Sequence, residues 1–152
     1  MRAIYFDMDG TIADLYGVDD WLPMLRSSNV RPYEVAEPMV DMDEFRKLCQ
    51  RAQAMGVIVG VISWLCKGSS MDYAKATRKA KREWLARHTG VVFDEVHIIP
   101  HGRPKQRYAK VSNAVLVDDS PIVCGQWDKG QTLDAKRSDW LNVLAMLLDE
   151  ME

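Results

Sequence analysis

Short apolar segments that alternate with amphipathic ones constrain most strongly how this chain of 152 residues can fold. The segment 57–62 (VIVGVI) is apolar throughout and rich in β-branched residues, as in strands buried on both faces. The predicted strands cover residues 2–6, 57–62, 96–99 and 114–117, with a weaker fifth near 132–133. Strands that alternate with helices indicate a parallel sheet covered on both sides. We therefore predict an α/β fold, a three-layer α/β/α sandwich with a parallel Rossmann-like sheet.

Amphipathic segments with recognisable ends fill the gaps between these strands. Asp41 followed by Glu44 resembles a capping box at the start of a helix. Ser69 is expected to begin a second helix, which Gly90 closes. The predicted helices cover residues 41–55, 69–88, a short stretch that begins near 104, and 138–151.

Residues 12–40 interrupt the alternation between the first strand and the first covering helix. They contain several aromatic and proline residues, and only residues 17–28 have a helical pattern. We interpret this stretch as a small insertion that lies over the strand ends. Because no repeat or linker divides the chain, residues 1–152 are expected to form one domain with a minimal cap insertion at about 12–40.

Composition excludes several classes of function. The net charge of -2 argues against a general binder of nucleic acids or acidic membranes. No apolar run approaches the roughly 20 residues that span a bilayer, and the N-terminal segment does not resemble a secretory signal. The three cysteines are far apart and form no CxxC pair, which favours the reducing cytosol. We therefore expect a cytoplasmic protein without a membrane partner.

Polar side chains gather where the predicted strands end. Ligands of a doubly wound sheet bind beyond the carboxyl ends of its strands, so these side chains are expected to converge. They are Asp7, Asp9, Thr11, Ser63, Lys105, Asp118 and Asp119. Clustered carboxylates ionise together when a cation neutralises them, and ligands that are all oxygen suit Mg²⁺. Together with a lysine and a hydroxyl group, the metal would form a site for a phosphoryl group.

The order and spacing of these residues resemble the four motifs of the haloacid-dehalogenase superfamily of phosphohydrolases. The matching segments are DMDGT at 7–11, the strand that ends in Ser63, the helix start at Lys105 and VLVDDS at 115–120. The resemblance implies that Asp7 is the nucleophile and that Asp9 is the general acid and base. An acid at position 9 is typical of phosphatases rather than of dehalogenases in this superfamily.

The resemblance also implies a ligand set and a phosphate site. Thr11 is expected to support the loop, Ser63 to bind phosphoryl oxygens and Lys105 to steady both nucleophile and phosphate. The predicted magnesium ligands are Asp7, Asp9 (through its backbone carbonyl), Asp118 and Asp119. The predicted phosphate-binding residues are Gly10, Thr11, Ser63, Trp64 and Lys105.

Simpler interpretations compete with these roles. Asp7 and Asp9 could form only a turn, whereas an EF-hand loop fits poorly because Val18 would occupy its twelfth position. Lys110 is an alternative to Lys105 as the motif lysine. The basic residues of the helix 69–88 are interpreted as a solvated face rather than a nucleic-acid contact. They are Lys75, Arg78, Lys79, Lys81, Arg82 and Arg87.

The substrate is less constrained than the chemistry. Aromatic residues of the insertion and Trp64 could stack on a nucleobase, although for Trp21 an anchor that holds the insertion on the core is the favoured interpretation. His101 is the histidine nearest to the predicted site. The segment VDDSP with Gly125 and Trp127 is also loosely similar to bacterial and phage 5'(3')-deoxyribonucleotidase-like proteins. A nucleotide is therefore the favoured substrate, with a nucleic-acid end and a non-catalytic binding module as alternatives.

Overall fold

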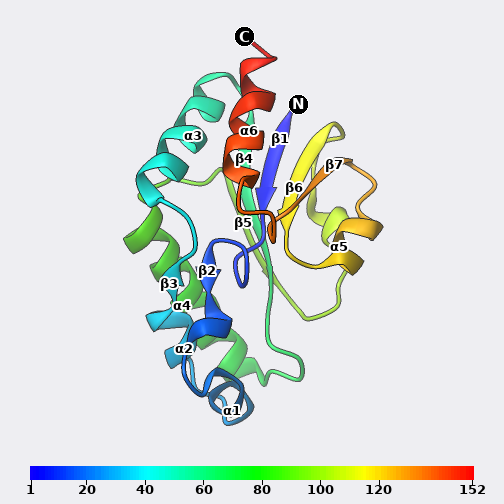
Figure 1. The fold of residues 1–152 in the computed structure, drawn as a ribbon. Helices are drawn as coiled ribbons and strands as arrows, with labels where there is room; N and C mark the ends of the chain where they lie inside the picture. Colours follow the sequence, from blue (N-terminus) through cyan, green and yellow to red (C-terminus); the bar gives the residue numbers. More distant parts are fainter.

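A five-stranded parallel sheet forms the centre of the protein, whose computed structural model describes residues 1–152 (Figure 1). The order of the strands is β5-β4-β1-β6-β7, and every neighbouring pair is parallel. Their bounds are β1 (Ala3–Phe6), β4 (Ile58–Trp64), β5 (Glu95–Ile99), β6 (Ala114–Asp118) and β7 (Gly130–Asp134). The predicted sheet, including its weak fifth strand, is confirmed.

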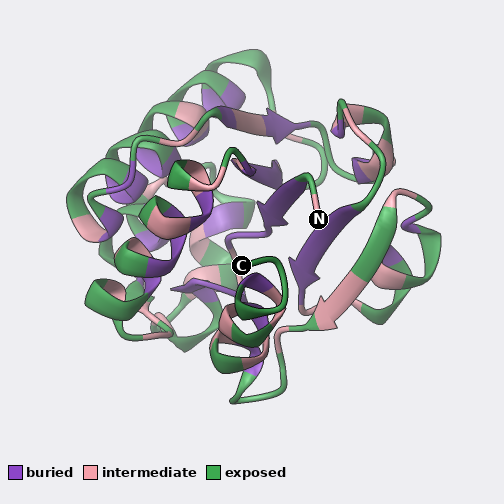
Figure 2. Cartoon of the chain, turned by 90° about the horizontal axis from the view of Figure 1, so that it is seen from above, coloured by how far each residue is buried: buried purple, intermediate pink, exposed green.

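Helices cover both faces of this sheet. Alternate residues of β1 point to opposite faces, so that Ile4 and Phe6 join one core and Tyr5 joins the other. The first core lies under α3 (Met42–Ala54), α4 (Met71–Thr89) and α6 (Trp140–Asp149). The second core lies under α5 (Pro121–Gln126) and the 3₁₀ helix η2 (Lys105–Tyr108). Figure 2 shows the central strands buried, whereas the edge strand β7 is partly exposed and partly intermediate.

The strand order reverses direction beside β1. From β1 the chain builds β4 and β5 on one side, and it then returns to place β6 and β7 on the other. Phe6 pairs with Val117 in the register of β1 and β6, and the backbone N–H of Asp7 donates to Val117 O at 2.9 Å. The residues that follow these two strands therefore lie side by side at the topological switch point, where such sheets bind ligands.

The insertion after β1 folds into short elements of its own. They are β2 (Ala13–Asp14), η1 (Leu15–Gly17), α1 (Trp21–Arg26), α2 (Arg31–Val35) and β3 (Glu37–Pro38), with β2 and β3 antiparallel. The prediction of one helical stretch was incomplete because it missed α2. Pro32 in the first turn of α2 is the sequence signal for that helix. The indole N–H of Trp84 in α4 donates to Ala36 O at 2.8 Å and so fixes the insertion to the main domain.

Several predicted boundaries shift by one or two residues. Strand β4 continues through Trp64, so Ser63 lies inside the strand rather than at its end. Ser70, not Ser69, caps α4, because its hydroxyl accepts from Tyr73 N at 3.1 Å. Helix α6 begins at Trp140 instead of residue 138. The cap that Asp41 provides for α3 is confirmed, since its side chain accepts from Glu44 N at 3.0 Å.

The predicted solvated basic face of α4 holds for its four exposed residues, Lys75, Lys79, Arg82 and Arg87, but it is wrong for the buried Lys81, and Arg78 is half-buried. Arg78 Nε donates to Ile98 O at 3.0 Å and Arg82 donates to Val96 O at 3.1 Å. These two carbonyls belong to the edge strand β5 and point away from β4, where they have no strand partner. Lys81 is completely buried.

Although α4 has 19 residues, neither it nor any other helix combines the length and apolar character needed to cross a membrane.

Candidate active site

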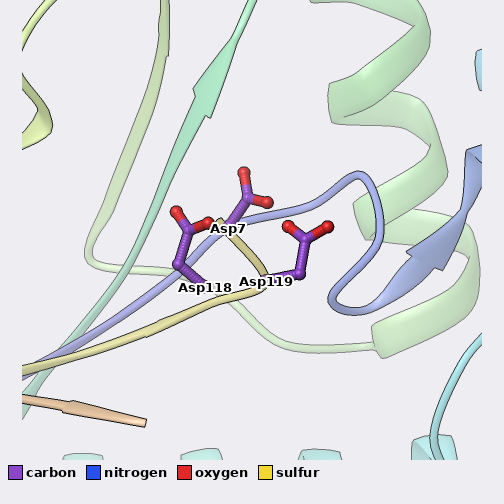
Figure 3. A group of neighbouring side chains, drawn as sticks. All are labelled: Asp7, Asp118 and Asp119. Carbon is purple, nitrogen blue, oxygen red and sulfur yellow. The ribbon is translucent and has the colours of Figure 1, made fainter. Parts of the chain in front are cut away.

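Three carboxylates meet where β1 and β6 end. Asp7 follows β1, Asp118 ends β6, and Asp119 is the next residue (Figure 3). One oxygen atom from each lies within 4.8 Å of the others. Three oxygen donors in this arrangement fit a hard divalent cation such as Mg²⁺. The structure thus brings together three of the four predicted metal ligands through their side chains.

Lys105 joins this cluster from the start of η2. Its Nζ donates to Asp7 Oδ1 at 2.8 Å and to Asp118 Oδ2 at 2.7 Å, and its side chain is 3% exposed. Burial lowers the pKa of Lys105, but the charges of Asp7 and Asp118 outweigh that effect and the pKa is raised overall. Lys110, the alternative motif lysine, instead lies 3.4 Å from Glu95. The geometry therefore favours Lys105 as the lysine of the site.

A second buried lysine, Lys81, which is predicted to lie on a solvated face, also reaches the site. Lys81 is 0% exposed, and its Nζ donates to Asp9 Oδ2, to Ser63 Oγ and to Trp64 O, each at 2.8 Å. The same ammonium lies 4.9 Å from the centre of the Tyr33 ring. The missed signal was helical spacing: position 81 shares the buried stripe of α4 with Thr77 and Trp84.

Asp9 faces Lys81 rather than the three clustered carboxylates. Burial raises the pKa of the Asp9 carboxyl, and the charge of Lys81 opposes that rise. Thr11 Oγ1 donates to Asp7 Oδ2 at 3.3 Å, which is consistent with its predicted support of the loop. Gly10 has a φ of +81°, and a Cβ there would overlap the Asp119 carboxylate. Only glycine fits where the loop after β1 passes so close to the residue that follows β6.

The electrostatics of the cluster favour cation binding. Burial and the nearby Asp7 charge raise the pKa of Asp118 to about 6 and that of Asp119 to about 7. Both groups have an ordinary pKa of 3.8. The charged forms are therefore costly in the absence of a counterion. A divalent cation would remove this cost and displace the protons.

A pocket of about 400 Å³ opens above these residues. Of the predicted site residues, those that line it are Asp7, Asp9, Trp64, Lys105, Asp118 and Asp119. Gly10, Thr11 and Ser63 do not line this pocket. His101 lines the pocket and lies 5.0 Å from Trp64 between ring centres.

The insertion forms one wall of the pocket. Its contributing residues are Leu15, Tyr16, Trp21, Leu22, Leu25 and Tyr33. Trp21 combines both roles considered for it, because it lines the pocket and also packs against the cluster that includes Leu25 and Tyr33. Tyr16 and Trp21 form an edge-to-face pair with ring centres 4.9 Å apart. An aromatic surface therefore faces the carboxylates.

Comparison with solved structures defines the fold. A D,D-heptose 1,7-bisphosphate phosphatase from Burkholderia thailandensis superposes with a TM-score of 0.53 and 12% identity over 95% of this chain and 99% of that one. The enzyme of the same name from B. bronchiseptica, complexed with magnesium and phosphate, gives 0.56 and 14% over 99% of both chains. The chain has the haloacid-dehalogenase fold.

Both superpositions cover almost the full length of this chain and of the compared chain. No protein-family model matches the sequence. No curated protein matches it either. The similarity to solved structures at 12% and 14% identity therefore confirms the predicted fold, and any activity has to be argued from the residues of the site.

Proposed function

We propose that this protein is a magnesium-dependent phosphatase that hydrolyses a phosphomonoester through an aspartyl-phosphate on Asp7. The observation that carries the proposal is the cluster of Asp7, Asp118 and Asp119 around the buried Lys105, on one side of a pocket of about 400 Å³. A structure with the same fold, the B. bronchiseptica phosphatase, binds magnesium and phosphate, which supports the assignment.

Asp7, Asp118 and Asp119 would hold the metal, together with the backbone carbonyl of Asp9. When bound, Mg²⁺ would neutralise the carboxylates and the phosphoryl oxygens that approach them. Lys105 adds a permanent positive charge beside Asp7, which holds that carboxylate in a fixed orientation. The site would thus offset the repulsion between an anionic nucleophile and an anionic substrate.

The chemistry proceeds in two steps on the residues of the chain. A carboxylate oxygen of Asp7 attacks phosphorus, while the bond to the leaving alcohol breaks and its oxygen takes a proton from Asp9. Asp9 then accepts a proton from water as that water attacks the phosphorus of the aspartyl-phosphate. The bond between phosphorus and the Asp7 oxygen breaks, inorganic phosphate leaves, and Asp7 is again a carboxylate while Asp9 is again protonated.

Lys81 is proposed to position two of these groups. It hydrogen-bonds Ser63, a predicted ligand of the phosphoryl oxygens, and Asp9, the predicted proton donor. A single ammonium thus sets the relative position of the phosphate-binding and proton-transfer groups. Gly10, Thr11 and Trp64 remain the other predicted phosphate-binding residues, and Trp64 accepts the third bond of Lys81 through its carbonyl.

A nucleotide is the favoured substrate within the class of small phosphorylated molecules. The pocket presents Tyr16 and Trp21 on the wall formed by the insertion, with Trp64 and His101 also lining it. Such surfaces stack on a nucleobase. The basic helix α4 gives less support to a nucleic-acid end than its sequence suggests, because Lys81 is buried and Arg82 and Arg87 donate to backbone carbonyls. A cytoplasmic location remains a prediction.

Release of inorganic phosphate tests the proposal directly. A panel of nucleotides, sugar phosphates and 5'-phosphorylated oligonucleotides should be assayed with Mg²⁺ and with EDTA. We expect turnover of at least one class with Mg²⁺, loss of turnover in EDTA, and the highest kcat/KM on a nucleotide. If folded, Mg²⁺-bound protein releases phosphate from none of them, the non-catalytic binding module replaces this proposal.

A further inference from the structure

A second cavity adjoins the catalytic pocket and is larger, at about 670 Å³. The two share four lining residues, Leu65, Cys66, Lys67 and His101, so they are contiguous. The outer cavity extends from these shared residues to the first turns of α4. A substrate held at Asp7 can therefore reach it without leaving the protein surface.

The lining of the two cavities differs in character. Ten of the eighteen residues around the catalytic pocket are hydrophobic, whereas only four of thirteen are hydrophobic around the outer cavity. The inner pocket suits the uncharged body of a substrate next to its phosphate. The outer cavity suits a polar or charged group.

Positive charge dominates the outer cavity. Lys67, Lys75 and Arg78 line it, and Asp72 is the only carboxylate among the lining residues. None of these four groups forms an ion pair within the protein. Three positive charges against one negative thus surround a concave site in a protein whose net charge is -2. Concave surfaces that carry one sign of charge concentrate ligands of the opposite sign.

Arg78 is held in position for such a ligand. Its Nε donates to Ile98 O at 3.0 Å, which fixes the guanidinium at the edge of the sheet. The terminal nitrogens make no other hydrogen bond with the protein, in contrast to those of Arg82 and Arg87, which donate to backbone carbonyls. A fixed guanidinium with free donors is well suited to a phosphate oxygen. The positive end of the α4 dipole adds to the same field.

We propose that the outer cavity binds a second anionic phosphate group of the molecule whose phosphomonoester reacts at Asp7. The inference rests on the proposed phosphatase function and narrows its substrate class to molecules with two phosphates or with a phosphodiester beside the reacting phosphate. Lys67 lies between the two sites and contacts both cavities. Lys75 and Arg78 bind the second group.

Matched pairs of phosphate compounds test the second site by calorimetry. The Asp7→Asn variant is used because it should not hydrolyse the compounds during the measurement. The pairs are adenosine 3',5'-bisphosphate with adenosine 5'-monophosphate, fructose 1,6-bisphosphate with fructose 6-phosphate, and 5'-phosphorylated dithymidylate with thymidine 5'-monophosphate. We expect at least one doubly anionic member to bind about 10-fold more tightly than its partner, with a steep salt dependence. The pair that shows the preference distinguishes a second monoester from a phosphodiester.

Substitutions locate the effect. Lys75→Gln and Arg78→Lys, each combined with Asp7→Asn, should weaken the doubly anionic ligand about 3- to 10-fold and leave its singly anionic partner within about 2-fold. Lys79→Gln, on the same helix but outside the cavity, is the control and should change neither. Lys75 is exposed, so its replacement leaves the fold intact even if Arg78→Lys disturbs the edge of β5.

The outcomes separate this inference from the proposed function. If wild-type protein releases phosphate from monoesters but no pair shows a preference, or Lys79→Gln reduces the preference as much as Lys75→Gln, the second site is wrong and the phosphatase stands. If no phosphate is released from any substrate but the preference is present and lost in Lys75→Gln, the phosphatase is wrong and the anion site stands.

Discussion

The floor and the wall of the catalytic pocket are built differently. Asp7, Lys105 and Asp118 form the floor and are almost completely buried, at 7%, 3% and 1% exposure. Tyr16 and Leu22 of the wall are 52% and 37% exposed. The floor rests on two central strands whose register fixes it, whereas the wall is an insertion of short helices and a two-stranded ribbon. The proposed catalytic groups are thus buried at the ends of central strands, whereas the proposed substrate-facing wall is more exposed.

This difference separates two kinds of substitution. A change on the floor should lower the rate for every substrate, because it alters groups that act on the phosphoryl oxygen and phosphorus. A change on the wall should alter the choice between substrates, because it alters contacts with the rest of the molecule. The predictions below test that division, beginning with the largest effect.

Asp7→Asn should abolish turnover of all substrates, by more than about 10³-fold in kcat, because an amide oxygen is a poor nucleophile toward phosphorus. Phosphate release at saturating substrate measures it. Asp134→Asn is the matched control, since Asp134 ends the neighbouring strand in register with Asp118 but lies outside the pocket. We expect the control to keep its activity within about 2-fold. Equal rates for Asp7→Asn and wild type would refute the assignment of the nucleophile.

The floor is also the part that the sequence predicts best. Apolar runs define β1 and β6, and the residue after each buried run must lie at the strand end, so Asp7 and Asp118 follow directly from the pattern. Lys105 follows from its place at a helix start after β5. Local pattern and long-range position coincide here because the sheet imposes one register on all its strands.

Tertiary contacts decide the features that the sequence did not predict. Lysine is a residue type that usually lies on the surface. The burial of Lys81 is favourable only because it hydrogen-bonds Asp9 and Ser63, which are 72 and 18 residues away in the sequence. Helix α2 has five residues and forms because it packs against α4, not because its propensity is high. The open edge of β5 supplies backbone acceptors for Arg78 and Arg82 that the sequence alone does not reveal.

Lys81→Met tests the division between floor and wall, because Lys81 lies beside the Tyr33 ring of the wall and also hydrogen-bonds Asp9 and Ser63. The change removes the shared donor of Asp9 and Ser63, and we expect kcat to fall about 10²-fold on every substrate, small or large. Steady-state kinetics and a melting curve measure rate and fold together, with the exposed Lys79→Met as control. A rate loss confined to nucleotides would place Lys81 with the wall instead.

Trp21→Ala should show the opposite behaviour. Loss of the aromatic wall should lower kcat/KM for a nucleotide about 10-fold, since stacking on an aromatic ring contributes roughly 1–3 kcal/mol per base. The value for glycerol phosphate should stay within about 2-fold. Met39→Ala, which is exposed in the same insertion and does not line the pocket, controls for damage to the insertion. Equal losses of kcat/KM on both substrates would show that Trp21 maintains the geometry of the catalytic groups instead of binding the base.

The smallest effect concerns the electrostatics of the floor. The pKa values of Asp118 and Asp119 are raised to about 6 and about 7, so the folded protein holds these protons more tightly than the unfolded chain does. The stability they add is present below a pH of about 4 and is lost as the pH rises through about 6 to 7. Magnesium competes with these protons. It should therefore raise Tm by about 3 °C more at pH 8 than at pH 5, measured by calorimetry.

Asp119→Asn gives the control for that measurement, because it removes one of the two carboxyl groups with a raised pKa, and with it one of the proposed metal ligands. The difference between the two pH values should shrink in this variant, while Tm in EDTA at pH 8 should rise toward its value at pH 5. A magnesium effect on Tm that is equal at both pH values in the wild type would mean that the cation does not bind through Asp118 and Asp119. The floor would then lack a metal site, the feature proposed to distinguish it from the wall.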